Sequence, residues 1–220
     1  MSFLQEKDKP DVQKILNNMV NPVKLIIFTS EQNCQYCQET KQLLNEVVDL
    51  TDNISLTEYD LATDSDAADQ YHIDKAPAIV IRADQDYGVR YFGIPSGYEF
   101  GSLLEDIVDI SRDDAGFSET QLDEIARIEK PLHLQVFVTP TCPYCPAAVR
   151  NAHRMAMVNP NITADMIEAT EFPELSQQYN VRGVPRTVVN DDFNIDGGLP
   201  EDAFIHQIVE HLETQNAASA

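Results

Sequence analysis

Short runs of apolar, often β-branched residues alternate along this chain with longer stretches whose apolar residues have helical spacing. Such runs predict buried strands, and apolar residues at every third or fourth position predict amphipathic helices. The predicted strands are 24–28, 54–59, 78–81 and 89–92 in the first half, and 132–138, 162–167, 187–189 and 193–195 in the second. The predicted helices are 12–19, 38–48, a segment ending near Tyr71, 100–110, 119–128, 147–157, a segment ending near Tyr179, and 203–212.

The two halves share one register, which indicates an internal duplication. A single offset maps Cys34 onto Cys142, Tyr71 onto Tyr179, Ile73 onto Val181, Pro77 onto Pro185 and Val80 onto Val188. Apolar residues often align by chance, but cysteine pairs and prolines at a common spacing rarely do. We predict an α/β protein of two domains, 1–114 and 115–220, each a mixed sheet flanked by helices.

All four cysteines fall in two CxxC pairs, Cys34 with Cys37 and Cys142 with Cys145. Each pair lies where an apolar strand gives way to a helix, whose free N–H groups and dipole stabilise a thiolate. Such a site can lower a cysteine pKa from about 8.5 into the range of about 3.5 to 7.5. We expect Cys34 and Cys142 to be the attacking nucleophiles, and Cys37 and Cys145 to resolve the mixed disulfide.

A metal site is the alternative for paired cysteines. Zinc ribbons place about 15 to 20 residues between their pairs, whereas these pairs stand in separate halves of the chain, without a histidine cluster. We therefore expect redox-active disulfides and no metal or other cofactor. A metal or iron–sulfur binding protein is the alternative of another class.

Pro77 and Pro185 follow their first cysteines at the same distance, each at the start of an apolar strand. This spacing favours a cis-proline loop that faces the cysteines and offers backbone groups to an extended substrate, with a strand-start proline as the plainer alternative. We therefore predict substrate contacts at Ala76, Pro77, Val184 and Pro185.

Two further pairs of residues flank the predicted sites. Tyr36 and Tyr144 lie inside the CxxC motifs and are expected to shape the sites and contact substrate. Asp60 and Glu168 share the register of the repeat at the ends of matching strands, and either could transfer protons during exchange. A solvated strand-end carboxylate is the alternative for both.

The charge balance argues against several classes of partner. With 15 basic and 37 acidic residues, the net charge of −22 repels nucleic-acid phosphates and anionic membrane surfaces. No apolar run approaches the roughly 18 residues of a membrane span, and the first residues do not resemble a signal peptide. We expect a cytoplasmic protein that binds neither nucleic acid nor membrane.

The chain resembles, over nearly its whole length, the two-domain protein disulfide oxidoreductases, which are also called glutaredoxin-like proteins. The resemblance rests on CQYC at 34–37, GVRYFGIPSG at 88–97, EDIVDISR at 105–112, FVTPTCPYCP at 137–146 and QYNVRGVP at 178–185. It implies two thioredoxin-like folds, a cis-proline beside each CxxC, a more active C-terminal pair, and reduction, formation or isomerisation of protein disulfides.

The resemblance also implies partners. Disulfide-containing proteins are the substrates, an NADPH-dependent flavoprotein of the thioredoxin reductase type is the electron donor, and a peroxiredoxin is a further acceptor. A dedicated electron carrier from that flavoprotein to a peroxiredoxin is therefore the alternative within redox chemistry. Thioredoxins have a buried Asp where this chain has Phe28 and Val136, so the proton route is expected to use other groups, such as Asp60 and Glu168.

Overall fold

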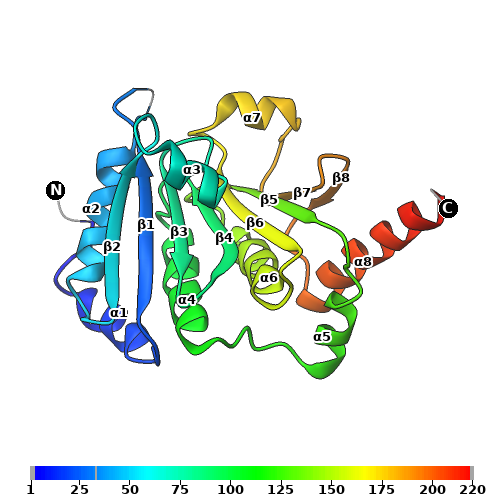
Figure 1. Cartoon of the computed structure of the whole chain (residues 1–220), viewed down its shortest axis with the longest axis horizontal. Helices are drawn as coiled ribbons and strands as arrows, with labels where there is room; N and C mark the ends of the chain where they lie inside the picture. The colour runs from blue at the N-terminus through cyan, green and yellow to red at the C-terminus, as the bar shows by residue number, and fades with distance from the viewer. Residues whose placement is uncertain (1–2, 33, 219–220) are drawn as a thin grey trace. The chain divides into compact units, whose positions relative to one another are not determined.

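The structure is a computed structural model that describes residues 3–32 and 34–218 (Figure 1). The outer ends of the predicted domains, 1–2 and 219–220, lie outside the described residues, as does position 33. The chain separates into two compact units, one formed by 1–86 and 90–114, the other by 115–220 together with 87–89. Both units contain helices and strands in the same order.

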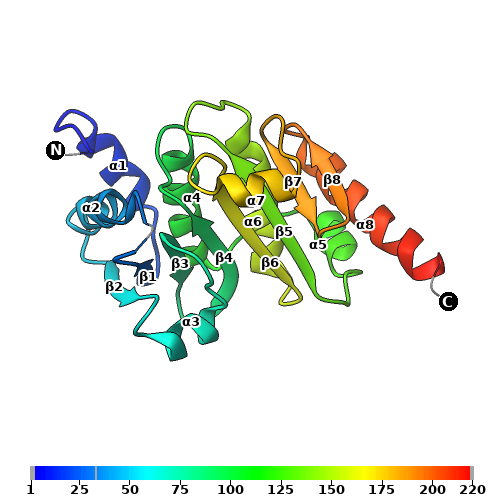
Figure 2. The same cartoon turned by 90° about the horizontal axis from the view of Figure 1, so that it is seen from above.

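The first unit is a mixed sheet between helices. Its elements are α1 (Lys9–Leu16), β1 (Val23–Thr29), α2 (Cys37–Val48), β2 (Ile54–Asp60), α3 (Ser65–Tyr71), β3 (Ala78–Arg82), β4 (Asp86–Phe92) and α4 (Glu99–Arg112). The strand order is β2-β1-β3-β4, in which β2 runs parallel to β1 and β3 runs antiparallel to β1 and β4. Figure 2 shows α2 and α4 on one face of this sheet and α3 on the other.

The second unit repeats this plan. Its elements are α5 (Glu119–Ile125), β5 (Leu132–Val138), α6 (Cys145–Val158), β6 (Ile162–Glu168), α7 (Pro173–Gln178), β7 (Arg186–Val189), β8 (Phe193–Asp196) and α8 (Glu201–Ala218). The order β6-β5-β7-β8 has the same directions as in the first unit. In Figure 1, α7 lies on one face of this sheet, and α5, α6 and α8 lie on the other. The predicted α/β architecture, with parallel and antiparallel strands flanked by helices in each half, is confirmed.

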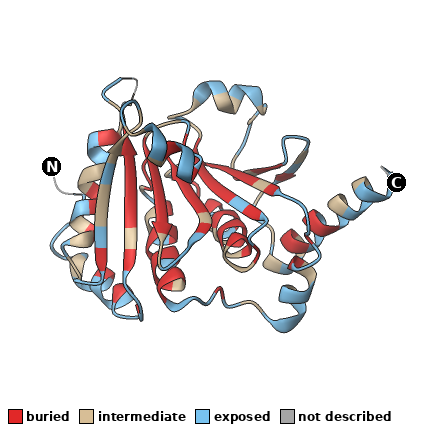
Figure 3. Ribbon diagram, viewed as in Figure 1, coloured by how far each residue is buried: buried red, intermediate tan, exposed pale blue. Residues whose placement is uncertain are grey.

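The central strands supply the core of each unit, as the buried residues in Figure 3 show. The aromatic packing at one end of the sheet is also repeated. The rings of Phe28 and Tyr71 have centroids 6.1 Å apart, and those of Phe137 and Tyr179 are 5.8 Å apart. The tyrosines that defined the repeat in the sequence therefore have equivalent packing in both units.

The first predicted helix has the wrong bounds, since α1 covers Lys9–Leu16 and not 12–19. Pro10 lies in its first turn, where the missing N–H group costs no hydrogen bond. Beyond the end of the helix, the side-chain amide of Asn18 donates to the carbonyl oxygens of Lys14 and Ile15. These bonds satisfy carbonyls that a longer helix would have paired.

Two helices of the second unit also differ from prediction. α5 ends at Ile125 and not at 128, because the Asn159 amide donates to the carbonyl oxygens of Ile125 and Ile128, both at 2.9 Å. α8 continues to Ala218 and not 212. Polar contacts hold its last turns, among them Gln215 with Asp192. In the part of the chain that the structure describes, no helix is both long and apolar enough to cross a membrane.

Candidate redox sites

Both CxxC pairs are disulfides, with the two Cα atoms of each pair 5.5 Å apart. Cys34 and Cys142 lie in the loops that follow β1 and β5, and their partners are the first residues of α2 and α6. Among the described residues there is no free cysteine. The strand-to-helix placement predicted for both pairs is confirmed.

The two sulfurs of each pair differ in their access to solvent. Cys34 is half-buried, whereas Cys37 is 2% exposed. Cys142 is 7% exposed and Cys145 is fully buried. In each unit a substrate can therefore approach the first cysteine more easily than the second.

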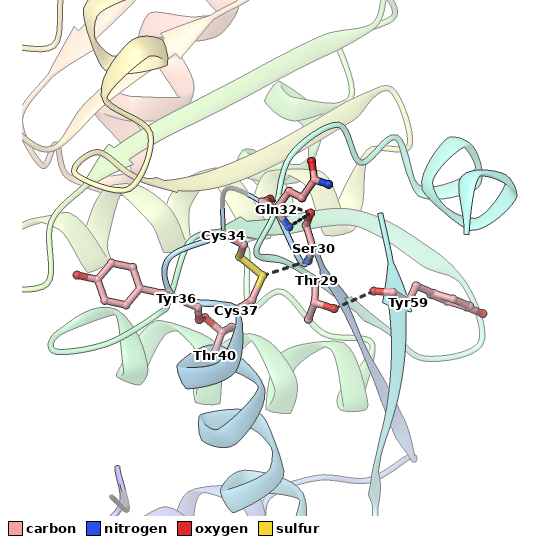
Figure 4. Close-up of a disulfide and its surroundings, with 8 residues drawn as sticks. All are labelled: Thr29, Ser30, Gln32, Cys34, Tyr36, Cys37, Thr40 and Tyr59. Atoms are coloured by element: carbon pink, nitrogen blue, oxygen red, sulfur yellow. Dashed lines mark hydrogen bonds between the residues drawn. A yellow bond between two sulfur atoms is a disulfide. The ribbon is translucent and has the colours of Figure 1, made fainter. Parts of the chain in front are cut away.

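Backbone and side-chain hydrogen bonds fix the loop around the first disulfide (Figure 4). The Ser30 N–H donates to Cys37 Sγ over 3.3 Å, so a backbone donor already points at this sulfur. At the start of the helix, the Thr40 hydroxyl and N–H both donate to the Tyr36 carbonyl oxygen. The side chain of Tyr36 points away from the disulfide, and its hydroxyl accepts a hydrogen bond from Gln35.

In the second unit, the turn at Gly197–Gly198 contacts both the proline loop and the CPYC loop. The Gly197 N–H donates to the Pro185 carbonyl oxygen over 2.8 Å. A Cβ atom on Gly198 would come within 2.8 Å of the Tyr144 carbonyl oxygen, so no other residue fits there without displacing the backbone. Tyr144 is 70% exposed. The sequence signal for this turn is the pair Gly197–Gly198, shortly before the last helix.

The peptide bonds before Pro77 and Pro185 are both cis, as predicted. Both prolines are buried, whereas the preceding residues, Ala76 and Val184, are half-buried. These loops therefore leave part of their surface open to solvent.

Strand register brings both proline loops to the end of the sheet where the cysteines lie. Phe28, at the end of β1, pairs with Ala78, the residue after the first proline. Phe137, at the end of β5, pairs with Arg186, the residue after the second. In each unit the end of the strand before the cysteine loop therefore lies beside the start of the strand after the proline loop.

Asp60 and Glu168 occupy equivalent places but differ in surroundings. Thr29 pairs with Asp60 and Val138 pairs with Glu168, so both carboxylates lie beside the start of a cysteine loop. Asp60 is half-buried, and its carboxylate accepts a hydrogen bond from the N–H of Ala62 at 2.8 Å. This carboxylate stabilises the turn that follows its own strand.

Glu168 is almost completely buried, with 2% of its surface exposed. Its Oε2 atom accepts hydrogen bonds from the Thr170 hydroxyl at 2.6 Å and the Glu171 N–H at 2.7 Å. Its Oε1 atom is buried and has no hydrogen-bond partner among the described residues. One carboxylate oxygen of Glu168 is thus held by two hydrogen bonds, whereas the other accepts none from the described residues. Within the described ranges, no group of three or more His, Cys, Asp or Glu side chains is arranged to hold a metal.

Comparison with known proteins agrees with this geometry. A thioredoxin-domain family model matches residues 132–210. This segment belongs to the thioredoxin superfamily, and each half of the chain carries one CxxC disulfide.

Solved structures resemble both halves together. A protein disulfide oxidoreductase from Aeropyrum pernix K1 has a TM-score of 0.87 and 27% identity, over 96% of this chain and 94% of that one. A C503A mutant of the alkylhydroperoxide reductase AhpF from Enterococcus faecalis has a TM-score of 0.86 and 25% identity, over 94% of this chain and 100% of that one. The protein is accordingly a member of this superfamily that carries two thioredoxin-like domains in tandem.

Curated relatives, which are also AhpF components of alkyl hydroperoxide reductases, match the same region. The relative from Staphylococcus epidermidis ATCC 12228 is 30% identical over 178 residues, which is 80% of this chain and 32% of the relative. The relative from Staphylococcus aureus NCTC 8325 is 31% identical over 183 residues, which is 83% of this chain and 33% of the relative. The chain thus spans about a third of these relatives.

Proposed function

We propose that the protein reduces, forms or isomerises disulfides in other proteins, with Cys34 and Cys142 as nucleophiles and Cys37 and Cys145 as resolving thiols. The difference in burial within each pair supports these roles. The first cysteine is the more accessible, and the second is buried at the first residue of a helix. We further propose that each pair works in its own domain, 1–114 or 115–220.

The reductive cycle transfers two electrons. The thiolate of Cys142 attacks one sulfur of a substrate disulfide, which forms a mixed disulfide and releases the other substrate sulfur as a thiolate. Cys145, after losing its proton, attacks the sulfur of Cys142 and releases the second substrate thiolate. The substrate thiolates take up protons, and the Cys142–Cys145 disulfide remains. The same steps in reverse oxidise a substrate dithiol.

The neighbouring residues are proposed to hold the substrate. An extended segment would lie against the loops at Ala76–Pro77 and Val184–Pro185, whose backbone groups are the natural partners for its own. Tyr36 and Tyr144 would form the outer walls of the two sites. A reducing compartment such as the cytoplasm would keep both pairs available as dithiols.

A second candidate is an electron carrier that passes reducing equivalents from a flavoprotein of the thioredoxin reductase type to a peroxiredoxin. The matches to alkyl hydroperoxide reductases favour this version. The two candidates use the same cysteines and differ in their acceptor. A reconstituted assay with NADPH, a thioredoxin reductase and a peroxiredoxin separates them, because a dedicated carrier supports peroxide reduction but reduces general disulfides poorly.

Cysteine variants test the proposal. The wild type should reduce insulin disulfides with dithiothreitol as the electron source, and Cys142→Ser should lose most of that activity. Cys145→Ser should instead accumulate a mixed disulfide with insulin, visible on a non-reducing gel, because the resolving thiol is missing. No activity in the wild type, or full activity in Cys142→Ser, would overturn the assignment.

A further inference from the structure

The two cis-proline loops carry different charges although they occupy equivalent positions. In the first unit, Asp74 and Lys75 form an ion pair of 2.5 Å, so the two charges cancel. Arg182 is the residue of the second copy that corresponds to Asp74 in the first. Arg186 directly follows the second proline. The second loop therefore has two positive charges in a chain whose net charge is −22.

An open pocket of about 540 Å³ lies at this second loop. Its lining includes Arg182, Pro185, Arg186, Asp196 and Gly197. The Gly197 N–H donates a hydrogen bond to the Pro185 carbonyl oxygen. The next residue, Gly198, packs against the backbone of Tyr144 in the CPYC loop. The pocket lining at Gly197 is thus one residue away from a contact with the loop that carries the C-terminal disulfide.

Both arginines keep unused hydrogen-bond donors. Arg182 is exposed, and its Nε donates to the side-chain oxygen of Asn180 at 3.0 Å. No carboxylate among the described residues pairs with it. Arg186 donates through Nη1 to Asp196 at 2.9 Å, while its Nε is buried and has no partner in the described part of the chain.

The ion pair within the pocket is easily replaced. The side chain of Asp196 is 71% exposed, whereas that of Arg186 is 16% exposed, so the carboxylate is the partner with room to move away from the pair. A substrate carboxylate can therefore compete with Asp196 for Arg186 at small cost. Arginine is well suited to this exchange, because its planar fork binds carboxylates through two parallel hydrogen bonds.

We propose, on the basis of the disulfide chemistry above, that the C-terminal site prefers substrate disulfides flanked by Asp or Glu. Arg182 and Arg186 bind those carboxylates, and Asp196 competes with them. The chain's overall negative charge acts against acidic substrates at a distance. At physiological salt, however, charges are screened over about 8 Å, so the arginines in contact with the substrate determine the preference.

Two disulfide peptides of equal length test this preference, one with Asp and Glu beside its cysteines and the other with Asn and Gln. The parent is the Cys34→Ser/Cys37→Ser variant, in which only the C-terminal pair reacts. It is reduced with dithiothreitol, freed of reductant and mixed with excess peptide. The reaction is then quenched with acid, and the remaining enzyme thiols are counted by alkylation and mass spectrometry. The readout is the ratio of the two rate constants, acidic over neutral.

We expect the parent ratio to be roughly fivefold, as two charge pairs at the protein surface would give at about 0.5 kcal/mol each. Arg182→Gln/Arg186→Gln should bring the ratio close to one, and Asp196→Asn should raise it. Arg127→Gln removes an exposed arginine elsewhere in the same unit and should leave the ratio unchanged. The Cys142→Ser/Cys145→Ser variant, in which only the N-terminal pair reacts, should show a ratio near one, because the charges of its loop cancel.

A parent ratio near one, or a ratio that the double arginine substitution does not change, would overturn the preference while leaving the exchange chemistry intact. An equal preference at the N-terminal pair would also overturn it, since that loop has no net positive charge. If neither peptide oxidised the reduced pair, the proposed function would fail and the preference with it.

Discussion

At the scale of single residues, the two sites differ most in the carboxylates beside their cysteine loops. Asp60 is half-buried and stabilises its own turn, whereas Glu168 is buried with one oxygen unpartnered. A resolving cysteine must lose its proton in a buried environment, and Cys145 is fully buried. Glu168 is therefore the better candidate of the two for accepting that proton.

Glu168→Gln keeps the side-chain shape and the oxygen that accepts the two local hydrogen bonds, but it cannot accept a proton. We predict that it slows mixed-disulfide resolution at neutral pH by about tenfold or more, since general acid–base catalysis contributes on the order of 10²-fold or more. The rate should recover at higher pH, where hydroxide replaces the base. Rapid-quench kinetics of the C-terminal pair across pH measure this. Glu174→Gln, an exposed change on α7, is the matched control, and equal pH profiles for the two variants would contradict the role.

Glu99 gives a residue-scale prediction for stability. Burial raises the pKa of its carboxyl group to about 7, opposed by a hydrogen bond from Ser102, whereas the usual value is 4.5. At a pH between 4.5 and about 7, Glu99 keeps its proton in the folded protein but has lost it in the unfolded chain. The contribution to stability should therefore fall as pH rises from about 4.5 to 7, by at most about 3 kcal/mol.

Urea unfolding at pH 5 and pH 8 tests this sign. Glu99→Gln stays neutral at both values, so the loss of stability between them should be smaller than in the wild type. Glu39→Gln, an exposed change on α2, should keep the wild-type difference. If Glu99→Gln lost as much stability as the wild type, the raised pKa of Glu99 would be wrong.

At the scale of elements, the apolar pattern predicted every strand, and the signal is strongest in central strands such as β1 and β5, which consist almost wholly of buried residues. Leu132–Val138 has the predicted bounds. Helix ends were less predictable, because polar contacts from distant residues decide them. The amide of Asn159, for instance, ends α5 from a position outside that helix. Such contacts have no local pattern in the sequence.

The start of α5 at Glu119 agrees with the prediction from apolar spacing, and the structure shows a local contact that fixes it. Ser118 and Gln121 form a reciprocal capping box, in which each side chain bonds the backbone N–H of the other residue. Ser118→Ala removes one of these bonds from a seven-residue helix and should lower the free energy of unfolding by about 1 kcal/mol. Urea denaturation measures this loss. Thr120→Ala, an exposed change in the first turn, should cost much less, and equal costs would contradict the capping role.

At the scale of the whole molecule, one fold carries two redox sites whose surroundings have diverged. The cysteines, the prolines and their cis conformation could be predicted from the repeat, because each copy confirms the other. Arg182 and Arg186 could not, because they have no counterpart in the first half. Their relevance depends on the glycine turn that brings their loop beside the CPYC motif, and only the structure shows that contact.

We conclude that both cysteine pairs are redox-active dithiols, and redox titration of each pair is the sharpest test of this claim. Wild type, Cys34→Ser/Cys37→Ser and Cys142→Ser/Cys145→Ser proteins are equilibrated with glutathione or dithiothreitol buffers, and their thiols are counted after alkylation. We predict one reversible two-electron transition for each intact pair, with a midpoint between about −270 and −180 mV, the range of thioredoxins and disulfide isomerases. A pair that formed no disulfide at any potential, or that held a stoichiometric metal ion, would contradict the claim.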